Sequence, residues 1–239
     1  MKITPSVYWL NGSAYSAVGN SETMGEAYGI ETNEGMILID CGRNPYGLDM
    51  INDNLKIFGV DKKITHCILT HAHHDHCGNA RRLQAEGVKI IVGKEELEYC
   101  INGGPIETET PYCDEQSFPA FYPDELISED KKETINGLEF DFIKTPGHTP
   151  GSMAIRVMID NKFILFTGDI LQPDGMLMDS INFGWKGDPR YSAEDIYLSI
   201  KKLNDYSVDI ILPGHGKICM RNGNELLKYA AKKAYMINK

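Results

Sequence analysis

Residues 68–79 read I-L-T-H-A-H-H-D-H-C-G-N and hold four of the seven histidines of the chain. The apolar residues at the start of this stretch predict the end of a buried strand, and residues 78–86 predict a helix. Ligand sites in layered α/β proteins lie in the loops at the carboxyl ends of strands. We therefore predict a metal-binding loop. The alternative, a solvated histidine-rich turn, is disfavoured because chance rarely places so many metal-binding side chains in one turn.

The spacing within this loop suggests two metal positions. In a turn that is not helical, alternate side chains point the same way and adjacent ones diverge. His71 and His73 are therefore expected to converge on one metal, and Asp75 and His76 to serve a second. His74 is out of phase with these pairs, so it is expected to support a ligand or to face solvent.

Composition and charge restrict the class of protein. A chain of 239 residues with 42% hydrophobic and 24% charged residues is typical of a soluble globular protein with an ample core. The net charge of −10 argues against a protein that binds nucleic acid by neutralising phosphates. No stretch has the length of a membrane-spanning helix, and the N-terminus lacks the pattern of a signal peptide. We expect a cytoplasmic protein with a small-molecule substrate and neither a nucleic-acid nor a membrane partner; a homo-oligomer is left open.

The cysteines form no C-x-x-C pair, and a chain of this length does not need disulfides to fold. They are expected to be mostly reduced. Cys77, beside His76, is either a soft metal ligand or a small buried residue, and packing as a small hydrophobe is the favoured role. The six are Cys41, Cys67, Cys77, Cys100, Cys113 and Cys219.

Both halves of the chain alternate strands with helices. Apolar patterns predict strands at 6–10, 27–32, 36–40, 64–70, 88–92, 138–144, 152–159, 162–167 and 208–212. Helices are predicted at 45–59, 78–86, 94–101, 193–203 and 225–236. This order indicates two sheets packed together and flanked by helices. No linker divides the halves, so residues 1–239 are predicted to form a single domain, in which the unpatterned but aromatic stretch 102–135 is a candidate substrate-covering lid.

Three more predicted strand ends each carry one residue that can bind a metal. They are His148 in T-P-G-H-T-P-G-S, Asp169 in F-T-G-D and His215 in L-P-G-H-G. Each is weak evidence alone, because a single histidine after a strand is more often structural. All three recur at the same topological place as the histidine cluster, and two metals of tetrahedral or five-coordinate geometry need about six or seven protein ligands. The candidate ligands are His71, His73, Asp75, His76, His148, Asp169 and His215.

The ordered motifs H-A-H-H-D-H, G-H-T-P-G, G-D and P-G-H-G resemble those of the metallo-β-lactamase superfamily. The resemblance implies an α/β fold, a four-layer αββα sandwich of two mixed β-sheets flanked by helices. It also implies one metal held by His71, His73 and His148, and a second metal held by Asp75, His76 and His215. Asp169 would bridge the two metals. Asp40, in I-D-C-G, matches the acidic residue at the end of an early strand and is expected to orient a ligand.

This resemblance implies a metal-dependent hydrolase. Two divalent cations, with zinc favoured and iron or manganese as alternatives, would lower the pKa of a shared water to about 7 and provide a metal-bound hydroxide. Asp75 is the candidate catalytic residue that orients the attacking water and accepts its proton. The predicted reaction is cleavage of a small ester, lactone or thioester, as in the glyoxalase II-like and lactonase-like members of the superfamily.

The intervals between motifs restrict which branch of the superfamily this chain resembles. His148 and Asp169 are 21 positions apart, and Asp169 and His215 are 46 apart, which is too short for the large inserted domain of the superfamily's nucleases. The spacing is most similar to that of acyl-homoserine-lactone lactonases, but those enzymes place a tyrosine shortly after the bridging aspartate, where this chain has Gln172 and Pro173. Tyr191 or a tyrosine of the lid could substitute for that tyrosine. Trp185 and Arg190 could supply a pocket wall or an anion contact, but their segment could equally be a solvent-facing connection.

Two other functions stay open from sequence. One is a mononuclear iron oxidoreductase like the persulfide dioxygenases, which resemble glyoxalase II; iron content and sulfur-dependent oxygen consumption would identify it. The other is a non-hydrolytic metal-binding protein, against which the complete set of ligands argues.

Overall fold

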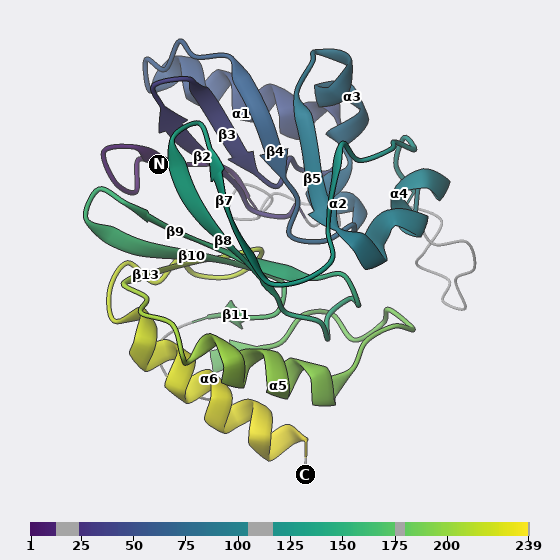
Figure 1. Ribbon diagram of the computed structural model, residues 1–239, viewed down its shortest axis with the longest axis vertical. Helices are drawn as coiled ribbons and strands as arrows, with labels where there is room; N and C mark the ends of the chain where they lie inside the picture. Colours follow the sequence, from purple (N-terminus) through teal and green to yellow (C-terminus); the bar gives the residue numbers. More distant parts are fainter. Residues whose placement is uncertain (13–23, 105–116, 175–179, 239) are drawn as a thin grey trace. The chain divides into compact units, whose positions relative to one another are not determined.

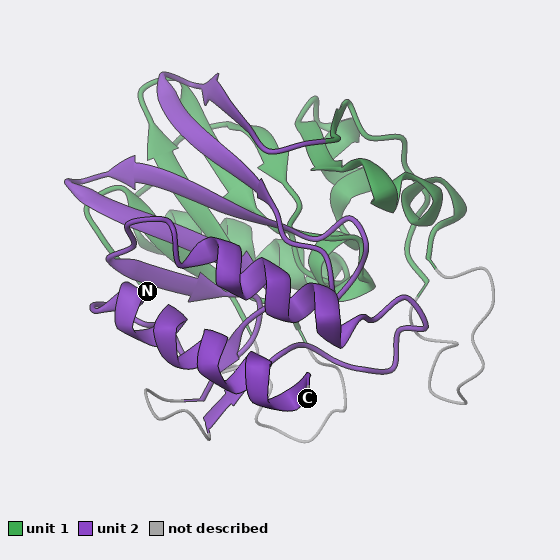
Figure 2. Cartoon of the chain, turned by 60° about the horizontal axis from the view of Figure 1, so that its bottom comes forward, with its two compact units in different colours: residues 1–128 green, residues 129–239 purple. Residues whose placement is uncertain are grey.

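The computed structural model describes residues 1–12, 24–104, 117–174 and 180–238 (Figure 1). Contacts along the chain divide it into two compact units, Met1–Ser128 and Glu129–Lys239, which are called unit 1 and unit 2 (Figure 2). Each unit has a mixed β-sheet and its own helices, so the predicted α/β class with two mixed sheets flanked by helices is confirmed.

Unit 1 is built on a six-stranded sheet whose spatial order follows the chain. Its strands are β1 (Val7–Asn11), β2 (Ala27–Thr32), β3 (Gly35–Ile39), β4 (Ile64–Ile68), β5 (Lys89–Gly93) and β6 (Glu125–Ile127). β1, β2 and β3 pair antiparallel, and β2 and β3 form a hairpin. β3, β4, β5 and β6 pair parallel, so the segments that follow β3, β4 and β5 emerge at one edge of the sheet. β6 was not predicted from sequence.

Helices of unit 1 cover one face of this sheet. α1 (Pro45–Ile57) begins after Asn44, whose side chain accepts a hydrogen bond from the amide of Gly47, and proline occupies the first helical turn, where its missing N–H costs nothing. α1 packs with α3 (Ala80–Ala85) in a core that also contains buried sheet residues. That core includes Leu48, Ile51, Leu55, Leu83, Leu38, Cys67, Leu69 and Ile90.

The loop after β4 corrects one prediction. Residues His74–Cys77 form a short helix, α2, whereas a non-helical turn was expected. The amides of His76 and Cys77 both donate to the carbonyl of His73, which turns the chain helical at this point. The next helix therefore starts at Ala80 rather than at Gly78, because Gly78 ends α2. A Cβ at Gly78 would lie 1.8 Å from the carbonyl oxygen of Arg43, so the close approach requires glycine.

The segment after β5 is also divided. A 3₁₀ turn, η2 (Lys94–Glu96), precedes α4 (Leu97–Asn102), where one helix over 94–101 was predicted. α4 ends at Gly103, which has the positive φ of 74° that glycine adopts without strain. Of the predicted lid, residues 105–116 lie outside the described residues, and the lid stays a prediction.

Unit 2 contains a five-stranded sheet in the order β13-β10-β9-β8-β7. The strands are β7 (Lys131–Ile135), β8 (Leu138–Lys144), β9 (Met153–Ile159), β10 (Lys162–Gly168) and β13 (Ile210–Pro213). β7, which was not predicted, starts an antiparallel meander that continues to β10, and β13 pairs parallel with β10. β8, β10 and β13 therefore run in one direction, and their carboxyl ends lie at one edge of the sheet. A separate two-stranded ladder joins β11 (Gln172–Pro173) to β12 (Ile181–Asn182).

Two helices, α5 (Ala193–Leu203) and α6 (Gly223–Ile237), lie side by side in unit 2 (Figure 1). The side chain of Ser192 accepts a hydrogen bond from the amide of Asp195 and so caps α5. The apolar faces of the two helices share one core with sheet residues. Members of this core are Ile196, Ile200, Leu203, Leu226, Leu227, Ala230, Ile143, Leu165 and Ile211.

Within the described ranges, no helix has the length and apolar character needed to cross a bilayer.

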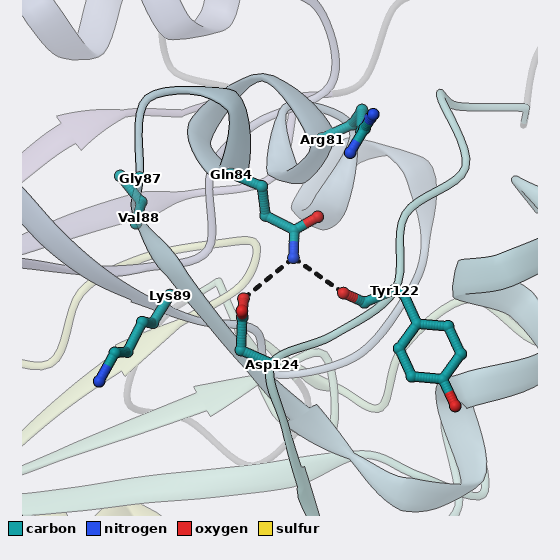
Figure 3. A pocket seen from close by; sticks show the side chains of 7 residues that line it. All are labelled: Arg81, Gln84, Gly87, Val88, Lys89, Tyr122 and Asp124. Carbon is teal, nitrogen blue, oxygen red and sulfur yellow. Dashed lines mark hydrogen bonds between the residues drawn. The ribbon is translucent and has the colours of Figure 1, made fainter.

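A cavity of about 340 Å³ opens on unit 1 beside α3 and β5. Figure 3 shows the amide of Gln84 bridging its wall, with hydrogen bonds to the carbonyl of Tyr122 (2.8 Å) and to Asp124 Oδ2 (2.9 Å). None of the predicted metal ligands lines this cavity.

Candidate metal centre

His71 and His73 converge in unit 1 as the alternation predicted. His71 Nε2 and His73 Nδ1 are 3.1 Å apart. The backbone at His73 is extended, with φ −72° and ψ 146°, so the two rings lie on the same side of the chain. His71 is fully buried. The pair lies at the carboxyl end of β4, where the parallel strands of unit 1 bring their following segments together.

Asp75 and His76 form a second pair in the same unit. Asp75 Oδ2 lies 3.6 Å from His76 Nε2, and both side chains are buried. They occupy successive positions of α2 instead of an extended turn, but the two side chains still converge. Gly25 packs against this pair, because a Cβ there would lie 2.7 Å from His76 Cε1.

Asp40 is connected to two of these histidines by a chain of hydrogen bonds. Asp40 Oδ1 accepts from the amide of Thr70 (2.7 Å), and Oδ2 lies 2.8 Å from both the hydroxyl of Thr70 and His76 Nδ1. Because the Thr70 hydroxyl donates to Asp40, it is an acceptor for His71 Nδ1 at 3.1 Å. This network assigns the ring proton of both histidines to Nδ1, so the Nε2 atom of each carries the lone pair that can bind a metal.

Burial dominates the electrostatics around this loop. It raises the pKa of Asp40, and the hydrogen bonds from His76 and Thr70 oppose that rise. Burial also lowers the pKa of His74 to about 4, so its ring is neutral at pH 7. His74 is half-buried, with Nδ1 4.0 Å from Asp75 Oδ1, and brings no positive charge near the candidate ligands.

Glu96 is a residue of this region that the sequence analysis missed. Its side chain is fully buried, and Oε2 accepts a hydrogen bond of 3.3 Å from the amide of Ala72. Ala72 lies between His71 and His73, so Glu96 holds the backbone that joins them. An acidic residue four positions after a predicted strand was the available signal, since β5 ends at the same edge of the sheet as β4.

Unit 2 brings its three candidate ligands together around one carboxylate oxygen. Asp169 Oδ2 lies 3.5 Å from His148 Nε2 and 3.5 Å from His215 Nε2. His148 and Asp169 are buried, while the side chain of His215 is 20% exposed. The three residues follow β8, β10 and β13, whose carboxyl ends share one edge of the sheet.

Two further residues of unit 2 touch these ligands and were not singled out from sequence as site residues. The side-chain amide of Gln172 donates to Asp169 Oδ2 at 3.0 Å. Gly184 lies against His148, because a Cβ at this position would be 2.3 Å from His148 Nδ1. Gly184 also has a positive φ of 61°. A glycine inside the aromatic F-G-W segment was the only sequence signal for it.

The three residues predicted to bind substrate, Trp185, Arg190 and Tyr191, differ from one another in exposure and contacts. Trp185 is 43% exposed, and its ring lies over Gly187. The guanidinium of Arg190 donates to both carboxylate oxygens of the buried Asp188, at 3.1 and 2.8 Å, so its charge is balanced within its own loop. Tyr191 is half-buried against the core of unit 2, and burial raises its pKa. Their contact with a substrate stays a prediction.

The distances within each cluster fit metal ligands. Zinc binds nitrogen and oxygen ligands at about 2.0–2.1 Å in tetrahedral geometry, which separates two ligands of one ion by about 3.3–3.5 Å. The closest ligand atoms within the units are 3.1 to 3.6 Å apart. Imidazole nitrogens with carboxylate oxygens suit zinc and similar divalent ions. The described residues thus contain His and Asp clusters that can bind a metal.

Gly184 provides a test of this geometry. We expect Gly184→Ala to lower metal affinity about tenfold, because the new Cβ would displace the ring of His148. Gly59→Ala is the matched control: Gly59 has a similar φ of 69°, but a Cβ added there would meet no atom within 4 Å. Both variants should lose about 1–2 kcal/mol of unfolding free energy from left-handed strain. Chelator competition compares them, and equal metal affinity in the two would contradict the role of Gly184.

Comparison with known proteins identifies the family. The protein-family model of the metallo-β-lactamase superfamily matches residues 21–215 of the sequence. The chain belongs to the metallo-β-lactamase superfamily. It is an enzyme of that superfamily, a metal-dependent hydrolase. The family and the enzyme class predicted from the motifs are thereby confirmed.

Individual relatives agree with this assignment. Hydroxyacylglutathione hydrolase GloC of Haemophilus influenzae is 31% identical over 168 residues, which cover 67% of this chain and 73% of that protein. An RNase J-like protein of Methanocaldococcus jannaschii is 29% identical over 59% of this chain, but the match covers 32% of that longer protein. The solved structure of a metallo-β-lactamase from Cronobacter sakazakii, an HARLDQ motif mutant, is 25% identical. It matches with a TM-score of 0.72 over 100% of this chain and 94% of its own, which confirms the predicted fold.

Proposed function

We propose that the His and Asp clusters of the two units form one dinuclear metal centre that hydrolyses a small ester, lactone or thioester. One ion is assigned to His71, His73 and His148, and the other to Asp75, His76 and His215, with Asp169 bridging. The observation that carries the proposal is the spacing inside each cluster, where ligand atoms are separated by 3.1 to 3.6 Å. We expect zinc, because tetrahedral nitrogen and oxygen sites suit it, with iron or manganese as alternatives.

The residues of the chain contribute orientation and proton transfer. Bound divalent cations lower the pKa of water and polarise a carbonyl group. Asp75 is the carboxylate that we assign to accept the proton of the attacking water. Thr70 and Asp40 accept hydrogen bonds from Nδ1 of His71 and His76, respectively. This leaves the Nε2 lone pair of each ring available to a metal.

Acyl thioesters are the first substrate class to test. The relative named hydroxyacylglutathione hydrolase favours them, and lactones come second because the intervals between motifs are similar to those of lactonases. The net charge of −10 supports a small-molecule substrate over nucleic acid.

Metal content tests the proposal directly. Protein purified without chelator or affinity nickel should contain about two zinc ions per chain by elemental mass spectrometry, and His148→Ala should contain fewer. His66→Ala is the matched control, because His66 is a half-buried histidine of β4 whose Nδ1 lies 3.0 Å from the hydroxyl of Thr65, outside both clusters. It should keep both ions. Turnover of acyl-glutathione thioesters, homoserine lactones and aryl esters is then measured on the zinc-loaded protein.

Two outcomes would overturn the proposal. A single iron per chain with sulfur-dependent oxygen consumption would assign the persulfide dioxygenase reaction instead. Protein free of divalent metal would remove the basis for hydrolysis at these residues.

A further inference from the structure

Gln172 donates a hydrogen bond to the carboxylate oxygen that faces both histidines of the unit 2 cluster. Its Nε2 donates to Asp169 Oδ2 at 3.0 Å, and the same oxygen lies 3.5 Å from the Nε2 atoms of His148 and His215. The hydrogen bond from Gln172 is therefore made to the same carboxylate oxygen that faces the two rings.

We propose that Gln172 is a positioning residue of the metal centre, whose amide holds Asp169 Oδ2 between His148 and His215. This inference rests on the proposed function, since it gives Gln172 a role in metal binding. Residues that hydrogen-bond to metal ligands fix ligand orientation, and losing one typically costs about 10–100-fold in metal affinity.

The β11–β12 ladder gives Gln172 the rigidity that this role needs. Gln172 pairs with Asn182, and Pro173 pairs with Ile181. The carbonyl of Pro173 accepts a hydrogen bond from the amide of Lys217, two residues after His215. A Cβ at Gly216 would lie 2.6 Å from that carbonyl oxygen, so the two segments are in close contact.

The segment that follows β12 also contacts His148, another candidate ligand of unit 2. β12 leads to Gly184, which lies against His148. β11 and β12 with their adjoining residues thus touch Asp169 directly through Gln172, His148 through Gly184, and the segment of His215 through Pro173. This short ladder and its adjoining residues therefore contact all three segments that carry the candidate ligands of unit 2.

The chemistry of an amide suits this position. A neutral amide donates a hydrogen bond but leaves the full negative charge of Asp169 available to cations. A lysine or arginine would pair with the carboxylate and compete with the metals for it, and a glutamate would place a like charge beside it. Glutamine is therefore able to orient the carboxylate without neutralising it.

Gln172→Met tests the proposal, because methionine has a similar length and no hydrogen-bond donor. The matched control is Gln84→Met: Gln84 also donates its amide to a carboxylate, Asp124 Oδ2 at 2.9 Å, but on the wall of the unit 1 cavity (Figure 3). Affinity for zinc is measured by chelator competition on the purified full chain. We expect Gln172→Met to bind zinc about 10–100-fold more weakly than wild type, since Asp169 is assigned to both ions, and Gln84→Met to bind both ions as wild type does.

Gln172→Asn distinguishes loss of the hydrogen bond to Asp169 from a folding defect caused by an apolar side chain. It keeps an amide and the polarity of β11, but the side chain is one methylene shorter, so we expect the same loss of affinity. Circular dichroism of the metal-free variants checks that all three retain the fold. Wild-type zinc affinity in folded Gln172→Met would overturn the role of Gln172 and leave the proposed function standing. Wild-type protein that binds no zinc would overturn both.

Discussion

Asp75→Asn is expected to lower kcat by about 10²–10⁴-fold, the range for loss of a general base, and to remove about one metal ion per chain. Asp75 is buried, and its Oδ2 lies 3.6 Å from His76 Nε2, the separation of two ligands of one ion. Asparagine preserves the shape of the side chain but has no charge to offer a cation and does not accept a proton from water. Both proposed roles of Asp75 are therefore lost together. Steady-state kinetics on the best substrate and elemental mass spectrometry measure the two effects.

Asp53→Asn is the control for this substitution. Asp53 is an exposed carboxylate of α1 that pairs with Lys56 at 3.0 Å, away from the candidate ligands. It should keep wild-type kcat and metal content, because an exposed ion pair of this kind contributes little. If Asp75→Asn retained both wild-type kcat and a full set of metal ions, the assignment of Asp75 would be wrong. A full set of ions with a reduced kcat would separate its proton-accepting role from its role as a ligand.

The sequence predicted most elements of the fold because these depend on local patterns. Apolar periodicity predicted α1 and α5, and motifs at predicted strand ends named seven candidate ligands, whose binding of a metal stays a prediction. Convergence of His71 and His73 followed from simple alternation, and their ring nitrogens are 3.1 Å apart. α2 was missed because its helical turn depends on two amides that donate to the carbonyl of His73. No pattern of residues in this stretch predicts these two hydrogen bonds.

Residues that support the ligands were harder to predict because their partners are distant in sequence or belong to very short elements. Glu96 reaches Ala72 across 24 positions through the parallel pairing of β4 and β5. Gln172 is only three positions from Asp169, but its orientation comes from a two-residue ladder too short to have a period. Asp40 is the exception, because the family motif named it and its carboxylate lies 2.8 Å from His76 Nδ1, while its effect on a bound metal stays a prediction.

Asp40→Ala is expected to lower the free energy of unfolding of the metal-free protein by about 3–5 kcal/mol. Asp40 is 2% exposed and accepts hydrogen bonds from the amide of Thr70, the hydroxyl of Thr70 and His76 Nδ1. Alanine would leave these buried donors without their acceptor, at about 1–3 kcal/mol for each one that finds no other partner. Asp40 also has a φ of 59°, a conformation that costs alanine about 1–2 kcal/mol. Urea denaturation in the presence of chelator measures the change.

Asp40→Asn separates the structural part of this effect from the part that acts on the metal. Asparagine tolerates the left-handed backbone, and its oxygen still accepts from the amide of Thr70, so the expected loss of stability is smaller, about 1–2 kcal/mol. The carboxylate that faces His76 Nδ1 is lost in both variants, and metal affinity should fall about 10–100-fold in both. If Asp40→Asn bound zinc as tightly as wild type, Asp40 would serve only to complete buried hydrogen bonds. A matching loss of affinity in the two variants, with unequal losses of stability, would show that its charge orients His76 for the metal.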